Sequence, residues 1–152
     1  MGDARRRTSI FALLATLALL FVPWTILGGR DFVFLWGLAT LDPVHVTTIT
    51  DYLFVYTAGL PRRLLAWPVS SLLYLLAVGS AAGGLLVGRE DRRVTAGLLV
   101  LSGVSHLWFA LGMVRRSTLV AIPLGTVLVW AVAWWFYWPD LRAMVVFDDS
   151  RA

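Results

Sequence analysis

Four long stretches of this chain contain no Asp, Glu, Lys or Arg, and they constrain its fold more than any other feature. They are residues Ile10–Leu27, Leu64–Gly88, Val94–Val114 and Thr118–Trp138. A helix needs about 20 apolar residues to cross the hydrocarbon core of a bilayer, and each stretch is close to that length. Because lipid cannot hydrogen-bond to an exposed backbone, such stretches are expected to be helices that span the membrane.

The composition supports a membrane environment for most of the chain. Of the 152 residues, 59% are hydrophobic and only 14% are charged, and the mean hydropathy is +0.80. A soluble domain is nearer half apolar and a quarter charged, so these few charges would not cover a water-exposed surface. We therefore predict an all-α integral membrane protein, a four-transmembrane-helix bundle that forms a single membrane domain over residues 1–152.

The segment between the first two predicted spans, residues 28–63, is predicted to be an outer amphipathic or re-entrant element. Asp42 and Pro43 suit the N-cap and the first position of a helix, and Gly59 and Pro61 would end it. The helix between them carries one histidine, one aspartate and four threonines, which suits an element lying on the bundle surface. A fifth span here is the alternative, but it would place charged groups in lipid.

The arginines set the expected orientation, because cytoplasmic loops of membrane proteins are enriched in basic residues. With the N-terminus inside, the cytoplasmic side would hold Arg5, Arg6, Arg7, Arg89, Arg92, Arg93, Arg142 and Arg151, and the outer side Arg30, Arg62, Arg63, Arg115 and Arg116. We expect a multi-pass protein of the cell membrane with both termini, and a short tail over residues 139–152, in the cytoplasm. Cleavage after the first span is disfavoured because no A-x-A-like site follows it.

Small residues in the second predicted span indicate where helices pack. Gly79 and Gly83, and Gly84 and Gly88, form two small-x-x-x-small pairs, which let helix backbones approach closely in lipid. We expect them to contact other helices of the bundle, and the alternative is a contact between two copies of the chain.

His106 is the one ionisable side chain inside a predicted span, which makes it a candidate functional residue. Ser102 and Ser105 lie near it on the helix and would form a polar patch with it. The simpler interpretation is a neutral histidine bonded to a neighbouring helix. His45 is expected on the same outer side, so His106 and His45 are candidate ligands of a cofactor such as haem, although two histidines alone carry little specificity.

The fourth predicted span ends in a cluster of aromatic residues. The interfacial candidates are Trp130, Trp134, Trp135 and Trp138. Tryptophan is enriched at the headgroup level of a bilayer, where its ring lies in apolar surroundings and its N–H finds a polar partner. We predict an interfacial anchor, and the alternative is an aromatic platform for a lipid or a partner helix.

Several runs carry a family resemblance that covers most of the chain. They are Asp51–Tyr56 with Gly59–Pro61, Glu90–Gly97 and Trp134–Pro139. These runs resemble an uncharacterised family of small multi-spanning membrane proteins of haloarchaea. The resemblance implies a location in an archaeal cell membrane and implies no catalytic chemistry.

The sequence as a whole predicts a non-enzymatic small membrane protein, an accessory or structural subunit or a lipid-associating bundle, with no cofactor. The absence of a carboxylate from every predicted span counts against coupled transport, and no acid–base pair or metal cluster points to an enzyme. A haem- or quinone-associated redox protein using His106, and a small transporter or channel, remain as alternatives. Membrane lipids are the expected partners, together with other membrane subunits or a second copy of the chain, and nucleic acid is not.

Overall fold

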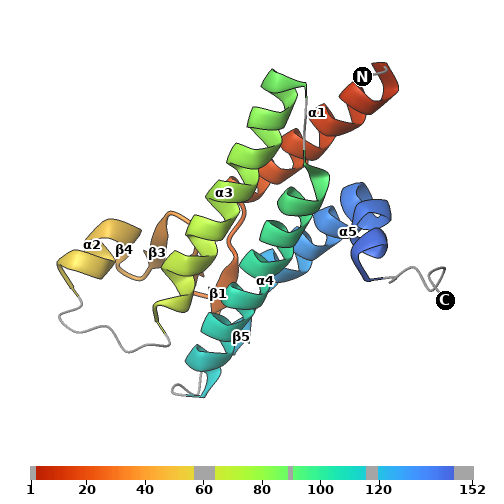
Figure 1. Ribbon diagram of the computed structural model, residues 1–152. Helices are drawn as coiled ribbons and strands as arrows, with labels where there is room; N and C mark the ends of the chain where they lie inside the picture. Colours follow the sequence, from red (N-terminus) through yellow and green to blue (C-terminus); the bar gives the residue numbers. More distant parts are fainter. Residues whose placement is uncertain (1–2, 57–63, 89–90, 116–119, 146–152) are drawn as a thin grey trace.

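The structure, a computed structural model, describes residues 3–56, 64–88, 91–115 and 120–145. Its helices are α1 (Asp3–Ala18), the 3-10 helix η1 (Leu19–Phe21), α2 (Ile49–Phe54), α3 (Ala66–Val87), α4 (Arg92–Val114) and α5 (Leu124–Val145). Its strands are β1 (Thr25–Leu27), β2 (Asp31–Val33), β3 (Gly37–Leu41), β4 (Val44–Thr48) and β5 (Ala121–Ile122) (Figure 1).

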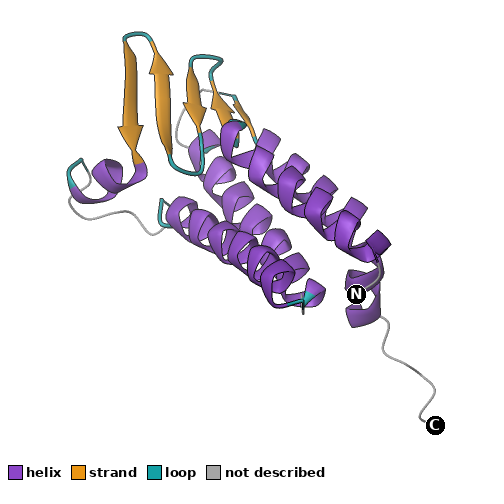
Figure 2. Cartoon of the chain, turned by 90° about the horizontal axis from the view of Figure 1, so that it is seen from above, coloured by secondary structure: helices purple, strands orange, loops and turns teal. Residues whose placement is uncertain are grey.

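The five strands form one antiparallel sheet at one end of the long helices. The strand order is β4-β3-β2-β1-β5, so the short strand before α5 completes the sheet beside β1. Figure 2 shows the strands together at one end of the helices and the N-terminus at the opposite end. The molecule is therefore a helical layer covered at one end by a small sheet.

The predicted four-transmembrane-helix all-α bundle is wrong. A sheet takes the place of parts of the first and fourth predicted spans, and among the described helices only α3 and α4 are long and apolar enough to cross a membrane. α1 has 16 residues, which is shorter than a bilayer requires. The second half of α5 is rich in Trp and Tyr and contains Pro139 and Asp140, which lower its hydropathy.

The helix in the first predicted span is shorter than expected because the chain changes conformation after Ala18. The helix ends at Ala18, η1 follows, and Pro23 precedes strand β1. Proline lacks the N–H that a continuing helix needs. The indole N–H of Trp24 then donates to the carbonyl of Leu19 at 3.0 Å and fixes this exit from the helix.

The strands β1 to β4 form three successive antiparallel hairpins where the amphipathic or re-entrant segment was predicted. Leu27 pairs with Asp31 across a turn in which Gly28 and Gly29 have positive φ, a conformation that glycine adopts without strain. Asp42 and Pro43 form the two-residue turn between β3 and β4, and they do not begin a helix.

A short helix does follow these hairpins, although it begins later than expected. The side chain of Thr48 accepts the backbone N–H of Asp51 and caps α2. The alternating β-branched residues of Val44–Thr48 favour a strand at the place where a helix was predicted. Residues 57–63, which contain the predicted helix end at Gly59 and Pro61, lie outside the described residues.

The boundaries of the other three predicted spans agree with the structure to different extents. α3 and α4 occupy nearly the whole of the second and third predicted spans. Within the fourth, residues 118–119 lie outside the described part, residues 121–122 are a strand, and the helix begins only at Leu124. α5 then continues to Val145 through the predicted cytoplasmic tail, of which residues 146–152 are not described.

The core lies where the helices meet beneath the sheet. Trp24, Tyr74, Leu99 and Val129, none of them accessible, belong to one cluster that joins the loop before β1 to α3, α4 and α5. A second cluster under the sheet includes Trp67. Burial of these large apolar side chains is the main force that holds the sheet against the helices.

Candidate functional site

His106 lies at the junction of the sheet and the helices, where it is inaccessible to solvent. Its Nε2 is 2.8 Å from the hydroxyl of Thr25, which is also inaccessible and belongs to strand β1. The two residues are 81 positions apart in the sequence. The contact therefore joins the middle of α4 to strand β1 of the sheet.

Two aromatic rings pack against the histidine. The ring of Trp24 meets it edge-on with centroids 5.1 Å apart, and that of Phe109 lies 5.6 Å away. Among the described residues, Nδ1 of His106 is the only fully buried side-chain polar atom without a hydrogen-bond partner. A buried polar atom without a partner lowers the stability of the fold, and such atoms occur in proteins where a structural or functional reason retains them.

The predicted polar patch of Ser102, Ser105 and His106 does not form one site. The hydroxyl of Ser102 donates to the carbonyl of Ser70 at 2.9 Å, and that of Ser105 donates to the carbonyl of Ala66 at 2.8 Å. Both serines therefore join α4 to α3, whereas His106 reaches the sheet. These hydroxyls act as polar contacts between packed helices, a common use of serine in membrane proteins.

Further hydrogen bonds attach the sheet to the helices. They run from side chains of α3 to backbone carbonyls of the connection between β2 and β3. The indole N–H of Trp67 donates to the carbonyl of Phe34 at 2.9 Å, and the hydroxyl of Ser71 donates to the carbonyl of Leu35 at 2.7 Å. Burial raises the pKa of the phenol of Tyr52, whose ring packs edge-on against Trp67. These contacts hold the β2–β3 connection and α2 over the start of α3.

His45 does not share a site with His106. It is an exposed residue of the edge strand β4, whereas His106 contacts β1. Three strand spacings separate these strands, which is about 14 Å. No group of three or more His, Cys, Asp or Glu side chains in the described part of the chain is placed to hold a metal. The geometry therefore does not combine the two histidines into a ligand pair.

The predicted packing glycines of α3 are mostly not used inside the chain. A Cβ atom added at Gly79, Gly83 or Gly88 would meet no atom within 4 Å, and Gly88 ends the helix with a positive φ. Gly84 is buried. The close approaches occur instead at Gly103 and Gly125, where an added Cβ would collide with the side chain of Trp130 and with Trp24, respectively.

The four tryptophans of α5 are exposed on its outer surface, and Trp130 also forms a hydrogen bond to α4. Trp134 and Trp138 stack with centroids 3.8 Å apart, and Trp135 is 81% exposed. The indole N–H of Trp130 donates to the carbonyl of Val100 at 3.2 Å, so this ring also joins α5 to α4. The arrangement suits the predicted interfacial anchor, which stays a prediction.

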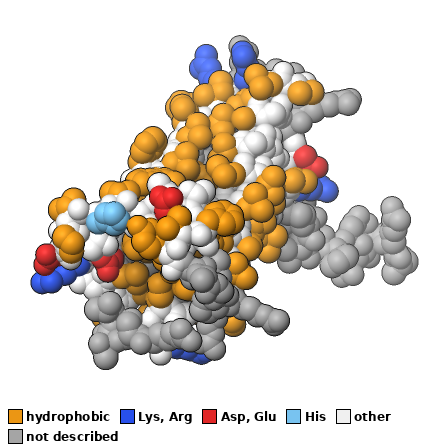
Figure 3. All heavy atoms as spheres, turned by 90° about the vertical axis from the view of Figure 1, so that its left-hand side faces the viewer, with side chains coloured by type: hydrophobic (Ala, Val, Ile, Leu, Met, Phe, Trp, Pro, Cys, Tyr) orange, Lys and Arg blue, Asp and Glu red, His pale blue; other side chains and the backbone are white. Residues whose placement is uncertain are grey.

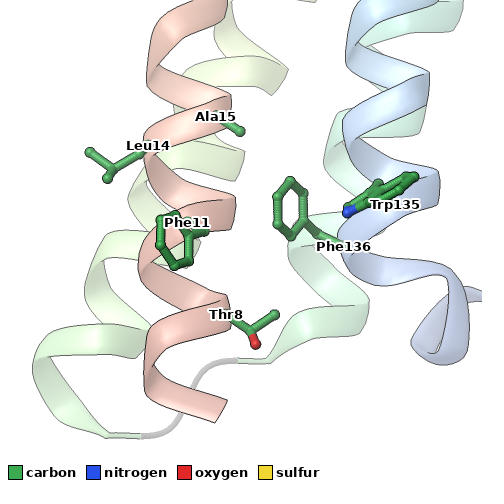
Figure 4. A pocket seen from close by; sticks show the side chains of 6 residues that line it. All are labelled: Thr8, Phe11, Leu14, Ala15, Trp135 and Phe136. Atoms are coloured by element: carbon green, nitrogen blue, oxygen red, sulfur yellow. The ribbon is translucent and has the colours of Figure 1, made fainter. Parts of the chain in front are cut away.

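An apolar groove of about 710 Å³ separates parts of α1 and α5. Its lining residues are Thr8, Phe11, Leu14, Ala15, Trp135 and Phe136 (Figure 4). In Figure 4 the ring of Phe136 projects from α5 toward α1, and Thr8 lies at one end of the labelled side chains. The groove is remote from His106 and was not foreseen from the sequence.

Arg92 joins three helices at the end of the molecule opposite the sheet. Its Nε donates to a carboxylate oxygen of Asp140 at 3.0 Å, and a second guanidinium nitrogen donates to the hydroxyl of Ser9 at 3.2 Å. The guanidinium also lies over the ring of Tyr137, 4.7 Å from its centroid. Sequence reasoning counted Arg92 only as a topology signal, because its partners are distant in the chain.

The fold and these contacts define a small helical protein with two helices suited to a bilayer, whose buried polar groups mainly join one element to the next. The chain belongs to the family of the domain of unknown function DUF8050, whose model matches residues 2–146. No match was found among curated proteins or among solved structures.

Proposed function

We propose that this protein is a non-enzymatic integral membrane protein that associates with lipid, acting as a small accessory or structural component of a cell membrane. In this proposal α3 and α4 cross the bilayer as a hairpin, and the sheet covers the helices at one membrane face. α1 and α5 pack beside the hairpin, with the aromatic outer surface of α5 at the headgroup level.

The observation that supports this proposal is the exposure of the two apolar helices. Only 33% of the most apolar window of α3, and 33% of that of α4, is buried inside the protein. The core helix of a soluble protein would be mostly buried, because exposed apolar patches of this extent are rare on soluble monomers. Figure 3 shows hydrophobic side chains covering much of one face of the molecule along the helices.

The hydroxyl groups between α3 and α4 support a structural role more than a catalytic one. Ser102 and Ser105 bond to α3, and Ser80 and Thr95 bond to each other at 2.9 Å across the same pair of helices. A hydroxyl that already bridges two helices is held by that contact and stabilises the hairpin in lipid.

The basic residues favour one orientation of the hairpin. Arg6, Arg7 and Arg93 are exposed at the beginnings of α1 and α4, at the end away from the sheet. By the positive-inside rule this end, with the beginning of α1 and the end of α5, faces the cytoplasm and the sheet faces outward.

Membrane fractionation tests the location. The full chain should stay with the membrane pellet after washing with alkaline carbonate and with urea, and should be extracted by mild detergent. Release of most of the chain into the aqueous wash would show that α3 and α4 do not cross the bilayer.

Single-cysteine labelling tests the orientation, and it is direct because the chain has no cysteine of its own. His45→Cys on β4 should react with a membrane-impermeant maleimide on intact cells, whereas Arg93→Cys should react only after permeabilisation. The unsubstituted chain gives the background. Labelling of both positions from the same side would contradict a hairpin that places the sheet and the beginning of α4 on opposite faces.

A further inference from the structure

The groove between α1 and α5 has the size and lining of a site for a hydrocarbon chain. Its volume of about 710 Å³ lies within the range of ligand sites in proteins, roughly 300–1,000 Å³. Phe11, Leu14 and Ala15 line it from α1, and Trp135 and Phe136 line it from α5. It is an open groove, so a chain lying in the surrounding lipid would enter it sideways.

One end of the groove is polar and is continued by basic residues. Thr8 lies at this end, and its hydroxyl already donates to the carbonyl of Ala4 at 3.0 Å. Arg7 is four residues before Phe11 and so shares its side of the helix, and Arg6 is adjacent. Both arginines are exposed, and neither has an ion-pair partner among the described side chains.

The acid nearest to this end along α5 does not compensate that charge. Asp140 is four residues beyond Phe136 and is bound to Arg92 at 3.0 Å. The next charged residue of α5 is Arg142, which is exposed and adds a positive charge to those of Arg6 and Arg7. A groove that is apolar along its length and cationic at one end complements a molecule with an acyl chain and an anionic head.

We propose that this groove binds one acyl chain of an anionic membrane phospholipid, whose headgroup contacts Arg6 and Arg7. Arginine presents several N–H donors to phosphate oxygens, and its long side chain reaches the headgroup level from a helix in the bilayer. The stacked pair of Trp134 and Trp138 belongs to the same part of α5 as the lining residue Trp135, and such rings suit the headgroup level. The inference rests on the membrane location proposed above.

Native mass spectrometry of the detergent-purified full chain tests the proposal, with phosphatidylglycerol and phosphatidylcholine as the two probes. The unsubstituted chain should retain one phosphatidylglycerol in preference to phosphatidylcholine. Arg6→Gln with Arg7→Gln should reduce that preference by about fivefold for each arginine, the effect of one basic residue near an anionic surface. Arg115→Gln, at the sheet end of α4, is the matched charge control and should leave the preference unchanged.

A second variant tests the groove itself. Ala15→Phe places a ring in the groove and should reduce binding of both lipids to the background level, whereas Ala82→Phe on α3 should bind as the unsubstituted chain does. Ala15→Leu, a milder filling, should give an intermediate result with an unchanged circular dichroism spectrum. Equal retention of the two lipids by the unsubstituted chain, equal binding by Ala15→Phe and Ala82→Phe, or a dimer in place of lipid adducts would overturn the proposal.

Fractionation of the same variants separates the two proposals. If the chain and its variants remain in the carbonate-washed membrane but show no lipid selectivity, the groove proposal fails and the membrane proposal stands. If the unsubstituted chain is recovered in the aqueous fraction, both fail together.

Discussion

Replacing Thr25 with Val tests the contact that joins the sheet to the helices. The substitution keeps the shape of the side chain and removes the hydroxyl that lies 2.8 Å from Nε2 of His106. Both ring nitrogens of His106 would then be buried without a partner, since Nδ1 already has none. A buried polar group left unpaired costs about 1–3 kcal/mol, so we expect Thr25→Val to lower the free energy of unfolding by that amount.

A double-mutant cycle isolates this contact from changes in packing. His106→Leu removes the other partner at similar volume, and the combination with Thr25→Val leaves two apolar groups facing each other. Replacing both partners of a hydrogen bond costs less than removing one, so the two changes should be coupled by about 1–2 kcal/mol. Equilibrium unfolding in mixed micelles, followed by tryptophan fluorescence, is a suitable assay because Trp24 contacts the His106 ring.

Thr126→Val is the matched control for this cycle. Thr126 is as buried as Thr25, but its hydroxyl donates to the carbonyl of Gly103 over a longer distance of 3.4 Å. We expect it to cost less than Thr25→Val. If the two Thr→Val variants unfold alike, or if the single changes at Thr25 and His106 simply add, the contact does not fasten the sheet to α4.

Three further perturbations follow from the helix packing and from the ion pair between α4 and α5. Gly125→Ala would place a Cβ atom 2.6 Å from the Cα atom of Trp24 and should destabilise the protein by about 1–3 kcal/mol. Gly79→Ala, which meets no atom within 4 Å in the middle of α3, should stabilise it by about 0.5–1 kcal/mol. Arg92→Gln would leave Asp140 without its cation and should cost about 1–2 kcal/mol, because that pair is largely shielded from solvent.

Thermal unfolding in detergent measures these changes against internal controls. The two Gly→Ala variants control for each other, and a change of the same sign in both would refute the packing argument. Arg30→Gln removes an ion pair with Asp42 that is 76% and 77% exposed, so it should change stability by less than about 0.5 kcal/mol. An Arg92→Gln effect as small as that would show that the link between α4 and α5 contributes little.

The apolar hairpin was predictable from the sequence because its determinants are local. α3 and α4 follow from uninterrupted apolar residues, and Asp91 caps α4 by accepting the N–H groups of Arg93 and Val94. For His106 the simpler interpretation of the sequence was a bond to a neighbouring helix, whereas its Nε2 lies 2.8 Å from the hydroxyl of Thr25. What could not be anticipated is that the neighbour is a strand.

The sheet was missed because apolar content alone does not distinguish a strand from a helix. Residues 25–27 and 121–122 are apolar enough to continue a helix, and they are strands because they pair with each other and with β2. The turn signal of Gly28 and Gly29 and the alternation in Val44–Thr48 were present in the sequence. The prediction instead took Asp42 and Pro43 as a helix start, whereas they form the turn between β3 and β4.

By itself, the sequence indicated two helices close to α3 and α4, because apolar runs that extend over 22 and 23 residues are longer than strands reach. The tertiary structure alone decided which polar side chains share a contact. Thr25 meets His106, Arg92 meets Asp140, and Phe11 and Phe136 line the same groove. Each pair brings together residues far apart in the chain, and such proximity is set by how the helices and the sheet pack in space.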